Sequence, residues 1–189
     1  MVVYALFMSS TKSYEFHEKV FKRHNFNHCM TKLLNVKPFR QSAGHCGPAS
    51  LKIVLEYYGI HKSEKELSRL VGSTTAMGVS AENIARAAKK LKMNAIIKDY
   101  SNLADIASYL NRGILVIVDW FSQTDGHYSV VVGLSKENIY IQDPELGFLR
   151  TMKRHAFMTL WFDFEGKYMV RKEDIIIRRM IAISPKKKI

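Results

Sequence analysis

The sequence predicts an α+β protein in which a helical half faces an antiparallel sheet. Segments with helical signals dominate up to residue 110, whereas most strand-like segments follow one another from residue 114 onward. Helices and strands that are segregated along a chain in this way are typical of the α+β class. A cleft between the two halves is the natural place for a functional site.

The chain is expected to fold as one compact unit. Its 189 residues and 47% hydrophobic content suffice for one good core but not for two full-sized domains. No internal repeat, low-complexity tract or linker rich in glycine, serine or proline interrupts it. We therefore predict a single domain at residues 36–189, preceded by an N-terminal helical arm at residues 1–35.

The first predicted helices lie in the N-terminal half. Residues 13–34 carry a ragged apolar stripe and are predicted to be loosely helical. Residues 48–58 are predicted as the next helix, because Pro48 suits a first helical position and Gly59 is a stop signal. That segment is nearly all apolar, so its helix is expected to be central and buried.

Three further helices and five strands are predicted downstream. Ser63 and Glu66 form a capping box that opens a helix ending at Gly72. Ser80 caps a helix that runs to about residue 92, and a third helix covers residues 103–110. Strand patterns occur at residues 94–98, 114–119, 128–134, 138–142 and 175–183.

The chain is strongly basic. It has 29 Lys and Arg residues against 17 Asp and Glu residues, for a net charge of +12. Such a balance favours acidic partners, nucleic acid or anionic membrane surfaces. The positive charges are spread along the chain and do not cluster beside aromatic residues, which argues against nucleic-acid binding and for a basic, solvated face.

Cysteine content and hydropathy indicate the compartment. Cys29 and Cys46 are too few for a disulfide framework and fit a reducing environment. No apolar run approaches the roughly 18 residues of a membrane-spanning helix, and the apolar residues 1–8 lack the basic leader of a signal peptide. We therefore expect a soluble protein without a transmembrane segment, with the cytoplasm as its default location.

Cys46 is the candidate nucleophile. It stands immediately before Gly47 and Pro48, at the mouth of the predicted buried helix, where free backbone N–H groups and the positive helix end favour an anion. The thiolate is the form of cysteine that attacks a carbonyl carbon, and Gly47 would let a substrate backbone approach closely. The alternative is that Cys46 is a small buried hydrophobic residue, as most isolated cysteines are.

His127 and Asp143 are the candidate base and orienting group. His127 follows Gly126 and opens an apolar strand, which would hold its imidazole rigidly as a general base requires. If the next strand pairs with it as a hairpin, Asp143 can accept the ring N–H and fix the tautomer that takes the thiol proton. The ordinary alternatives are a histidine at the core edge and an aspartate in a turn before Pro144. Asp125 is the other acidic candidate near His127.

Two other groups of residues are candidates for a functional role. His24, His28 and Cys29 could form part of a metal site, but they lack the four-ligand set that zinc requires. Three aromatic side chains flank the candidate base and either line a cleft or pack in the core: Trp120, Phe121 and Tyr128.

The candidate residues belong to short motifs that occur in order along the chain: Gln41, Cys46-Gly47-Pro48-Ala49-Ser50-Leu51, Tyr57-Tyr58-Gly59, Thr75-Ala76-Met77-Gly78-Val79-Ser80, His127-Tyr128-Ser129-Val130 and Asp143-Pro144. This series, over about residues 41–161, resembles the peptidase C39 family of papain-like cysteine proteases. The resemblance implies a papain-like fold in which Cys46 attacks the scissile carbonyl, His127 passes the proton to the leaving amine and Asp143 holds His127. It also implies that Gln41 helps to bind the developing oxyanion, although a polar loop residue is the alternative.

The sequence departs from the family pattern in two places. Gln41 lies five residues before Cys46, one fewer than in papain-like enzymes, and His45 stands where exporter-linked members often carry an acidic residue. His45 could instead tune the thiol electrostatically. Exporter-linked members are fused to a transporter and cut leader peptides after paired glycines. This chain has no such region, so it is expected to be a stand-alone member, and that substrate is not carried over.

The sequence therefore predicts a thiol hydrolase that cleaves a peptide or related amide bond through an acyl-enzyme at Cys46, without a metal or organic cofactor. Two alternatives stay open: a degenerate domain that binds peptide segments without cutting them, and an acyltransferase that uses the same site. A peptide or protein substrate is the expected partner, and the oligomeric state is left open.

Overall fold

The computed structural model describes residues 31–74, 78–123, 125–164, 166 and 168–186. Its centre is a six-stranded antiparallel sheet with strand order β1-β8-β2-β3-β4-β5, and a second sheet pairs β6 with β7. The strands are β1 Met93–Lys98, β2 Leu115–Ser122, β3 Asp125–Leu134, β4 Asn138–Asp143, β5 Phe148–Lys153, β6 Phe162–Phe164, β7 Ile175–Ile177 and β8 Met180–Pro185.

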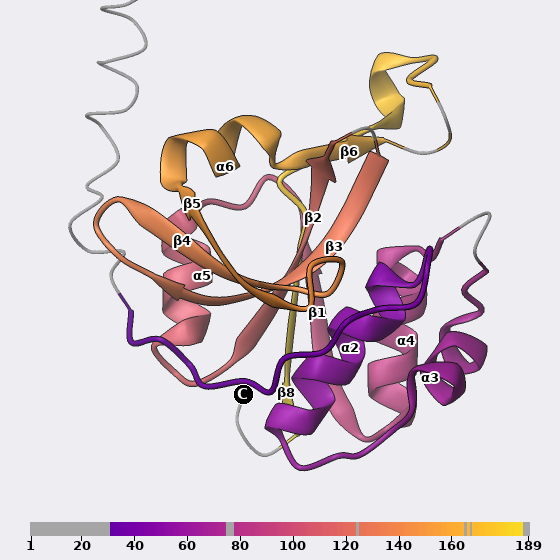
Figure 1. The fold of residues 1–189 in the computed structure, drawn as a ribbon. Helices are drawn as coiled ribbons and strands as arrows, with labels where there is room; N and C mark the ends of the chain where they lie inside the picture. Colours follow the sequence, from indigo (N-terminus) through magenta and orange to yellow (C-terminus); the bar gives the residue numbers. More distant parts are fainter. Residues whose placement is uncertain (1–30, 75–77, 124, 165, 167, 187–189) are drawn as a thin grey trace, which may run out of the picture.

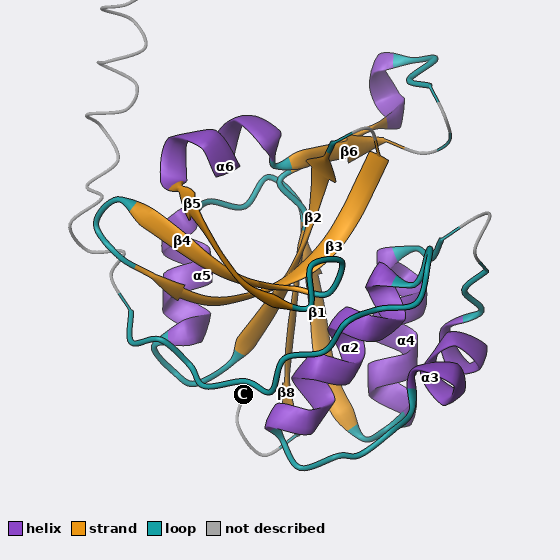
Figure 2. Cartoon of the chain, in the orientation of Figure 1, coloured by secondary structure: helices purple, strands orange, loops and turns teal. Residues whose placement is uncertain are grey.

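The helices are α2 Cys46–Tyr57, α3 Glu64–Val71, α4 Ala81–Lys90, α5 Leu103–Leu110 and α6 Arg154–Leu160, with a 3-10 turn at Lys172–Asp174. Figure 1 shows α2, α3 and α4 gathered in one group beside the sheet, apart from α5 and α6. Figure 2 shows the same arrangement coloured by secondary structure. The predicted α+β class, with a helical half against an antiparallel sheet, is confirmed.

Helix α2 is the central helix that its apolar sequence predicts. Eight of its residues are buried, from Gly47 to Leu55. The helix begins at Cys46, so Pro48 is its third residue and not its first. Proline fits there because N–H groups of the first turn have no partner within the helix. The Ser50 hydroxyl donates to the Tyr128 carbonyl at 3.0 Å, which fixes the helix onto β3.

The cap signals mark the other predicted helices. The Ser63 and Glu66 capping box is formed, and Gly72 ends α3 in the left-handed conformation with φ of 71°. The Ser80 side chain accepts the Asn83 N–H at the start of α4. These local signals are confirmed because caps depend on neighbouring residues and little on tertiary context.

The predicted helix at residues 13–34 falls mostly outside the described residues, and its described end, residues 31–34, is not helical. There the chain runs along β3: the Thr31 N–H donates to the Leu134 carbonyl at 2.9 Å, and the Leu34 N–H to the Val132 carbonyl at 2.8 Å. Gly133 permits this approach, since a side chain there would meet Leu33 at 2.9 Å. Contacts with the sheet override the weak helical pattern.

The predicted strand at residues 175–183 is divided between the two sheets. Arg178 has a positive φ of 49° and interrupts it, so β7 pairs with β6 and β8 enters the main sheet. Arg179 anchors the break through its ion pair with Asp99 at 2.7 Å. The structure also adds β5, α6 and β6, which the sequence pattern does not predict.

None of the helices among the described residues combines the length and the apolar content that crossing a membrane requires.

Candidate active site

Cys46 is the first residue of α2 and is half-buried. The preceding residue, His45, makes no side-chain cap, so the N–H groups of the first turn remain open to another acceptor. Gly47, the next residue, is buried, and an added Cβ there would overlap Val79 and lie 3.5 Å from Tyr128. The glycine therefore allows the start of the helix to pack tightly against Val79 and against Ile84 of α4.

His127 is the third residue of β3, so it lies inside the strand and does not open it as the sequence predicted. It is paired with Trp120 of β2 and is 6% exposed. The two rings make an edge contact with centroids 5.8 Å apart. Strand pairing and this ring contact together restrict the orientation of the imidazole.

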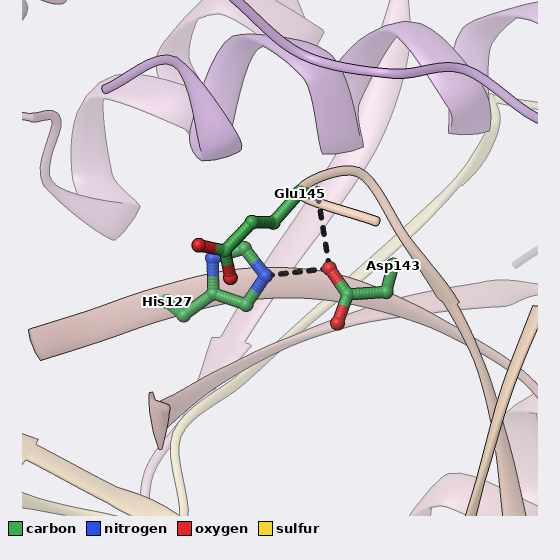
Figure 3. A group of neighbouring side chains, drawn as sticks. All are labelled: His127, Asp143 and Glu145. Carbon is green, nitrogen blue, oxygen red and sulfur yellow. Dashed lines mark hydrogen bonds and ion pairs between the residues drawn. The ribbon is translucent and has the colours of Figure 1, made fainter. Parts of the chain in front are cut away.

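Asp143 ends β4 and meets His127 through the predicted hairpin. Its Oδ1 accepts a hydrogen bond from His127 Nε2 at 2.8 Å and another from the Glu145 N–H at 3.0 Å. Its Oδ2 accepts from Arg150 Nη1 at 3.0 Å. Figure 3 shows Asp143 beside one ring nitrogen of His127, with the second carboxylate oxygen turned away from it.

Electrostatic interactions favour the charged forms of His127 and Asp143. Burial works against protonation of His127, but its hydrogen bonds with Asp143 and Cys46 raise its pKa to about 9. Burial likewise opposes ionisation of Asp143, but the bonds from His127 and Arg150 hold its pKa below its usual range. The imidazole is therefore held between a carboxylate and a thiol.

Gln41 lies close to the turn that follows Asp143. Its N–H donates to the Pro144 carbonyl at 2.8 Å, and its side-chain Oε1 is buried without a hydrogen-bond partner. The structure therefore brings Gln41 to the same end of the sheet as Asp143. His45 points elsewhere: its Nδ1 lies 3.2 Å from the Ser73 hydroxyl, beyond α3.

The other residues that the sequence singles out make different contacts or lie outside the described residues. Asp125 is exposed and accepts a hydrogen bond from the neighbouring Gly126 N–H, so Asp143 is the acidic partner of His127. Trp120 is 1% exposed and belongs to the core. Phe121 stacks on Phe162 with centroids 5.3 Å apart. His24, His28, Cys29 and residues 75–77 of the predicted motif lie outside the described residues.

The sequence analysis missed Arg150 and Glu145. Arg150 comes from β5, which was not predicted, and its guanidinium lies 5.2 Å from the centre of the Trp120 ring. Glu145 is exposed in the turn after Asp143. The only available signal was its place two residues after the candidate aspartate.

A buried acidic pair had no signal in the sequence. Asp119 of β2 is 2% exposed and interacts with Asp163 of β6 and with Tyr128. Burial and the neighbouring Asp163 raise the pKa of Asp119 well above its usual range. No sequence pattern could have linked two aspartates that come from separate sheets.

The comparisons with known proteins agree with the fold and the motifs. The model of the peptidase C39 family matches residues 36–168. An uncharacterised protein of Methanothermobacter marburgensis is 32% identical over 142 residues, which cover 71% of this chain and 89% of that protein. The lactococcin-A transport/processing ATP-binding protein of Lactococcus lactis is 30% identical over 61% of this chain, but only 16% of that protein is covered.

Solved structures share the fold. The peptidase domain of Streptococcus ComA, described as a bifunctional ABC transporter, gives a TM-score of 0.62 at 22% identity, covering 80% of this chain and all of that one. A double-glycine motif protease, solved with its leader peptide, gives 0.61 at 21% identity, with coverage of 82% and 94%. With its fold, its motifs and the match over residues 36–168, the chain belongs to the peptidase C39 family.

Proposed function

We propose that the protein is a cysteine peptidase that hydrolyses a peptide or related amide bond through an acyl-enzyme on Cys46. The observation that carries this proposal is the position of His127 between Asp143, at 2.8 Å, and the thiol of Cys46. A nucleophile, a base and a group that orients the base are the parts that such chemistry needs. Membership of the C39 family supports the same activity.

In this proposal His127 takes the thiol proton and the thiolate of Cys46 attacks the scissile carbonyl carbon. The ring nitrogen that is not bonded to Asp143 carries that proton and donates it to the leaving amine, so the amide C–N bond breaks and a thioester remains. Water then attacks the thioester with His127 as base, which releases the acid and restores the thiol. Asp143 holds the imidazole in the required tautomer.

Gln41 is the proposed oxyanion donor, together with the backbone N–H of Cys46 at the start of α2. Its attachment to Pro144 at 2.8 Å supports this role, because it holds the residue beside the turn that carries Asp143. The role requires the side-chain amide N–H to point at the developing oxyanion. Removing one such donor typically lowers kcat by about 10²–10³-fold, so we expect a loss of that order for Gln41→Ala.

A peptide is the proposed substrate class. The related lactococcin protein is named for transport and processing, and one structural neighbour was solved with a leader peptide. These facts concern those proteins, and they support a peptide for this chain without specifying its sequence.

The deciding experiment is intact-mass labelling with a peptide-like, thiol-directed electrophile. We expect one label per chain on the native protein, and no labelling of Cys46→Ala or of His127→Ala under the same conditions. Cys29→Ser is the matched control, because it removes the other thiol and should leave labelling unchanged. At about pH 7, Cys46 should also be alkylated much faster than Cys29.

Equal labelling of the two thiols, or none on the folded protein, would favour a domain that only binds peptides. Labelling that depends on Cys46 and His127 justifies a substrate screen in which candidate amines are included. A conjugate with such an amine, detected by mass, would indicate acyl transfer in place of hydrolysis.

A further inference from the structure

Glu145 presents a free carboxylate to the imidazole of His127. Figure 3 shows its side chain folded back across the ring, with the carboxylate on the side away from Asp143. One of its oxygens lies within 4.8 Å of a ring nitrogen of His127. Glu145 is exposed, and no hydrogen bond or ion pair within the described part of the chain engages its carboxylate. The carboxylate is therefore open to a group from another molecule.

The turn that carries Glu145 is held in place through its backbone. The Glu145 N–H donates to Asp143 Oδ1 at 3.0 Å, and the Gly147 N–H donates to the Asp143 carbonyl at 2.8 Å. The Gln41 N–H donates to the Pro144 carbonyl, also at 2.8 Å. None of these bonds uses the side chain of Glu145, so the carboxylate is presented from a fixed backbone and a substitution leaves the bonds in place.

The charge of Glu145 has no counterpart in the candidate site. Asp143 is balanced by Arg150, whose Nη1 lies 3.0 Å from Oδ2. In the proposed function Cys46 and His127 share one proton, and this pair is neutral in total whichever of them holds it. The charges of these four residues therefore cancel, and the carboxylate of Glu145 remains to attract a cation.

The position of Glu145 indicates which part of a substrate it meets. In the proposed function, His127 donates a proton to the leaving amine from the ring nitrogen that Asp143 does not occupy. The residue that contributes this amine must lie against the imidazole, on the side where Figure 3 shows Glu145. A lysine or arginine side chain there would pair with the carboxylate, whereas an acidic side chain would be repelled.

We propose that Glu145 is a specificity-determining residue that binds a cationic side chain of the substrate on the leaving-amine side of the bond that is cut. The inference rests on the proposed function, because the role of His127 defines that side. Arg40 packs on the same turn, where an added Cβ at Gly147 would lie 2.8 Å from its Cβ. Among the described residues, however, it makes no ion pair with Glu145, so the carboxylate is left for the substrate.

The test uses three peptide-like, thiol-directed electrophiles that differ only in the residue on the leaving side: lysine, norleucine or glutamate. The readout is the rate at which each labels Cys46 in the Cys29→Ser protein. We expect the lysine probe to react about two- to fivefold faster than the norleucine probe, the range for an exposed ion pair, and the glutamate probe to be slowest. Added salt should reduce these differences.

Two substitutions of Glu145 change its charge in steps. Glu145→Gln should bring the three rates together, and Glu145→Lys should reverse their order. Glu137→Gln is the matched control, because Glu137 is also exposed but is paired with Lys153, at 2.6 Å, in another turn. It should keep the preference of the wild type.

Equal rates for the three probes on the wild type, or a preference that persists in Glu145→Gln, would overturn the inference while the Cys46–His127 pair stands. A second set of probes carries the lysine on the acyl side, where we expect no dependence on Glu145. A Glu145-dependent preference for that set would show that the cation binds on the other side of the bond.

Failure of the proposed function gives a different result, since no probe would then label the folded protein. Binding is measured for that case by titrating Nα-acetyl-lysine methylamide into isotope-labelled protein and following the ring signals of His127 by NMR. We expect saturable shifts that are lost in Glu145→Gln and that the norleucine analogue does not cause. If lysine and norleucine act alike, Glu145 does not bind the cation.

Discussion

Asp143 combines complete burial with three hydrogen bonds to its two oxygens. It is 0% exposed and receives bonds from His127, the Glu145 backbone and Arg150. A buried carboxylate needs such partners to stay ionised. Arg150 also lies over Trp120, whose ring contacts His127. The Arg150 side chain therefore touches both Asp143 and Trp120, the two residues that hold the imidazole in place.

Arg150→Met is predicted to slow labelling of Cys46 about tenfold and to shift the acid limb of its pH dependence to higher pH. Loss of the guanidinium removes a contact that lowers the pKa of Asp143, so Asp143 is neutralised at a higher pH. A hydrogen bond to a charged group contributes about 1.5–3 kcal/mol. Loss of the Arg150–Asp143 bond is expected to weaken the positioning of His127 by part of that amount, which corresponds to about a tenfold change in rate. The measurement is the labelling rate as a function of pH.

Two variants sharpen this test. Arg150→Lys keeps the charge and should restore much of the rate, whereas Lys153→Met removes a cation from the same strand and should have no effect. A profile of Arg150→Met that superimposes on that of the wild type would rule out a positioning role for Arg150.

His127 is predicted to stabilise the fold in a pH-dependent way. Its folded-state pKa of about 9 lies above its ordinary value of 6.5, so its contribution is fully present below about pH 6.5 and is lost as the pH rises to about 9. The contribution amounts to at most about 3 kcal/mol. Urea unfolding of wild type and His127→Gln, with a chelator present, should give a stability difference that shrinks over this range; a constant difference would contradict the pKa.

Among single residues, sequence reasoning proposed Cys46, His127 and Asp143, and these three side chains lie close together in the structure. Their order and their positions on a helix start and two adjacent strands made this possible. Arg150 and Glu145 were missed because charged residues in turns and edge strands are usually solvated, and nothing local distinguishes these two. The catalytic roles themselves stay predictions.

The start of α2 depends on a close contact between elements. An alanine at Gly47 would overlap Val79, which precedes α4. We predict that Gly47→Ala displaces the first turn of α2 and slows labelling of Cys46 sharply. Adding Val79→Ala should restore much of the rate, because it removes the atom that the new methyl group would overlap, and leaves the end of the Ile84 side chain, at 3.2 Å, as the next contact. Additive losses in the double variant would show that the two positions are not coupled.

The acidic pair links β2 to β6 and is predicted to weaken the fold as the pH rises. Both Asp119 and Asp163 have raised pKa values. Burial is the largest cause for each, and the neighbouring charge of Asp163 raises the pKa of Asp119 further. Tyr128 and Arg179 also interact with Asp119. The protonated form of the pair is the stable one, so the contribution of the pair to stability is fully present below about pH 4 and is lost as the pH rises through the folded-state pKa values.

Asp119→Asn should flatten this dependence, because an amide keeps the shape of the acid without ionising. The check is the thermal midpoint of both proteins from about pH 5 to about pH 9. Parallel curves would show that the pair does not ionise in this range.

Among the elements, the predictions that rest on helix caps were the most accurate. Ser63, Gly72 and Ser80 gave correct ends for α3 and α4 because capping is local. Strand β5 was missed because it is half-exposed and has no run of β-branched residues. The split of residues 175–183 depends on Arg179 reaching Asp99, a long-range contact that no window of sequence contains.

At the scale of the whole molecule, β8 joins the two parts of the sheet. Ile181 is fully buried and is paired with Ile97 of β1 on one side and with Ile117 of β2 on the other. We predict that Ile181→Ala lowers the free energy of unfolding by about 2–5 kcal/mol. Hydrogen exchange should show β1 and β2 losing protection together, whereas loss in one strand alone would indicate that β8 does not couple them.

The position of β8 between β1 and β2 also constrains the order in which the sheet can form during synthesis on the ribosome. Strands β1 and β2 are synthesised long before residues 180–185, and until β8 emerges each keeps an unpaired edge. Exposed edges are sites where nascent chains pair wrongly with one another. Strand β2, whose Trp120 contacts His127, adjoins that gap, so the support of the candidate active site is expected to be completed only after residues 180–185 have been translated.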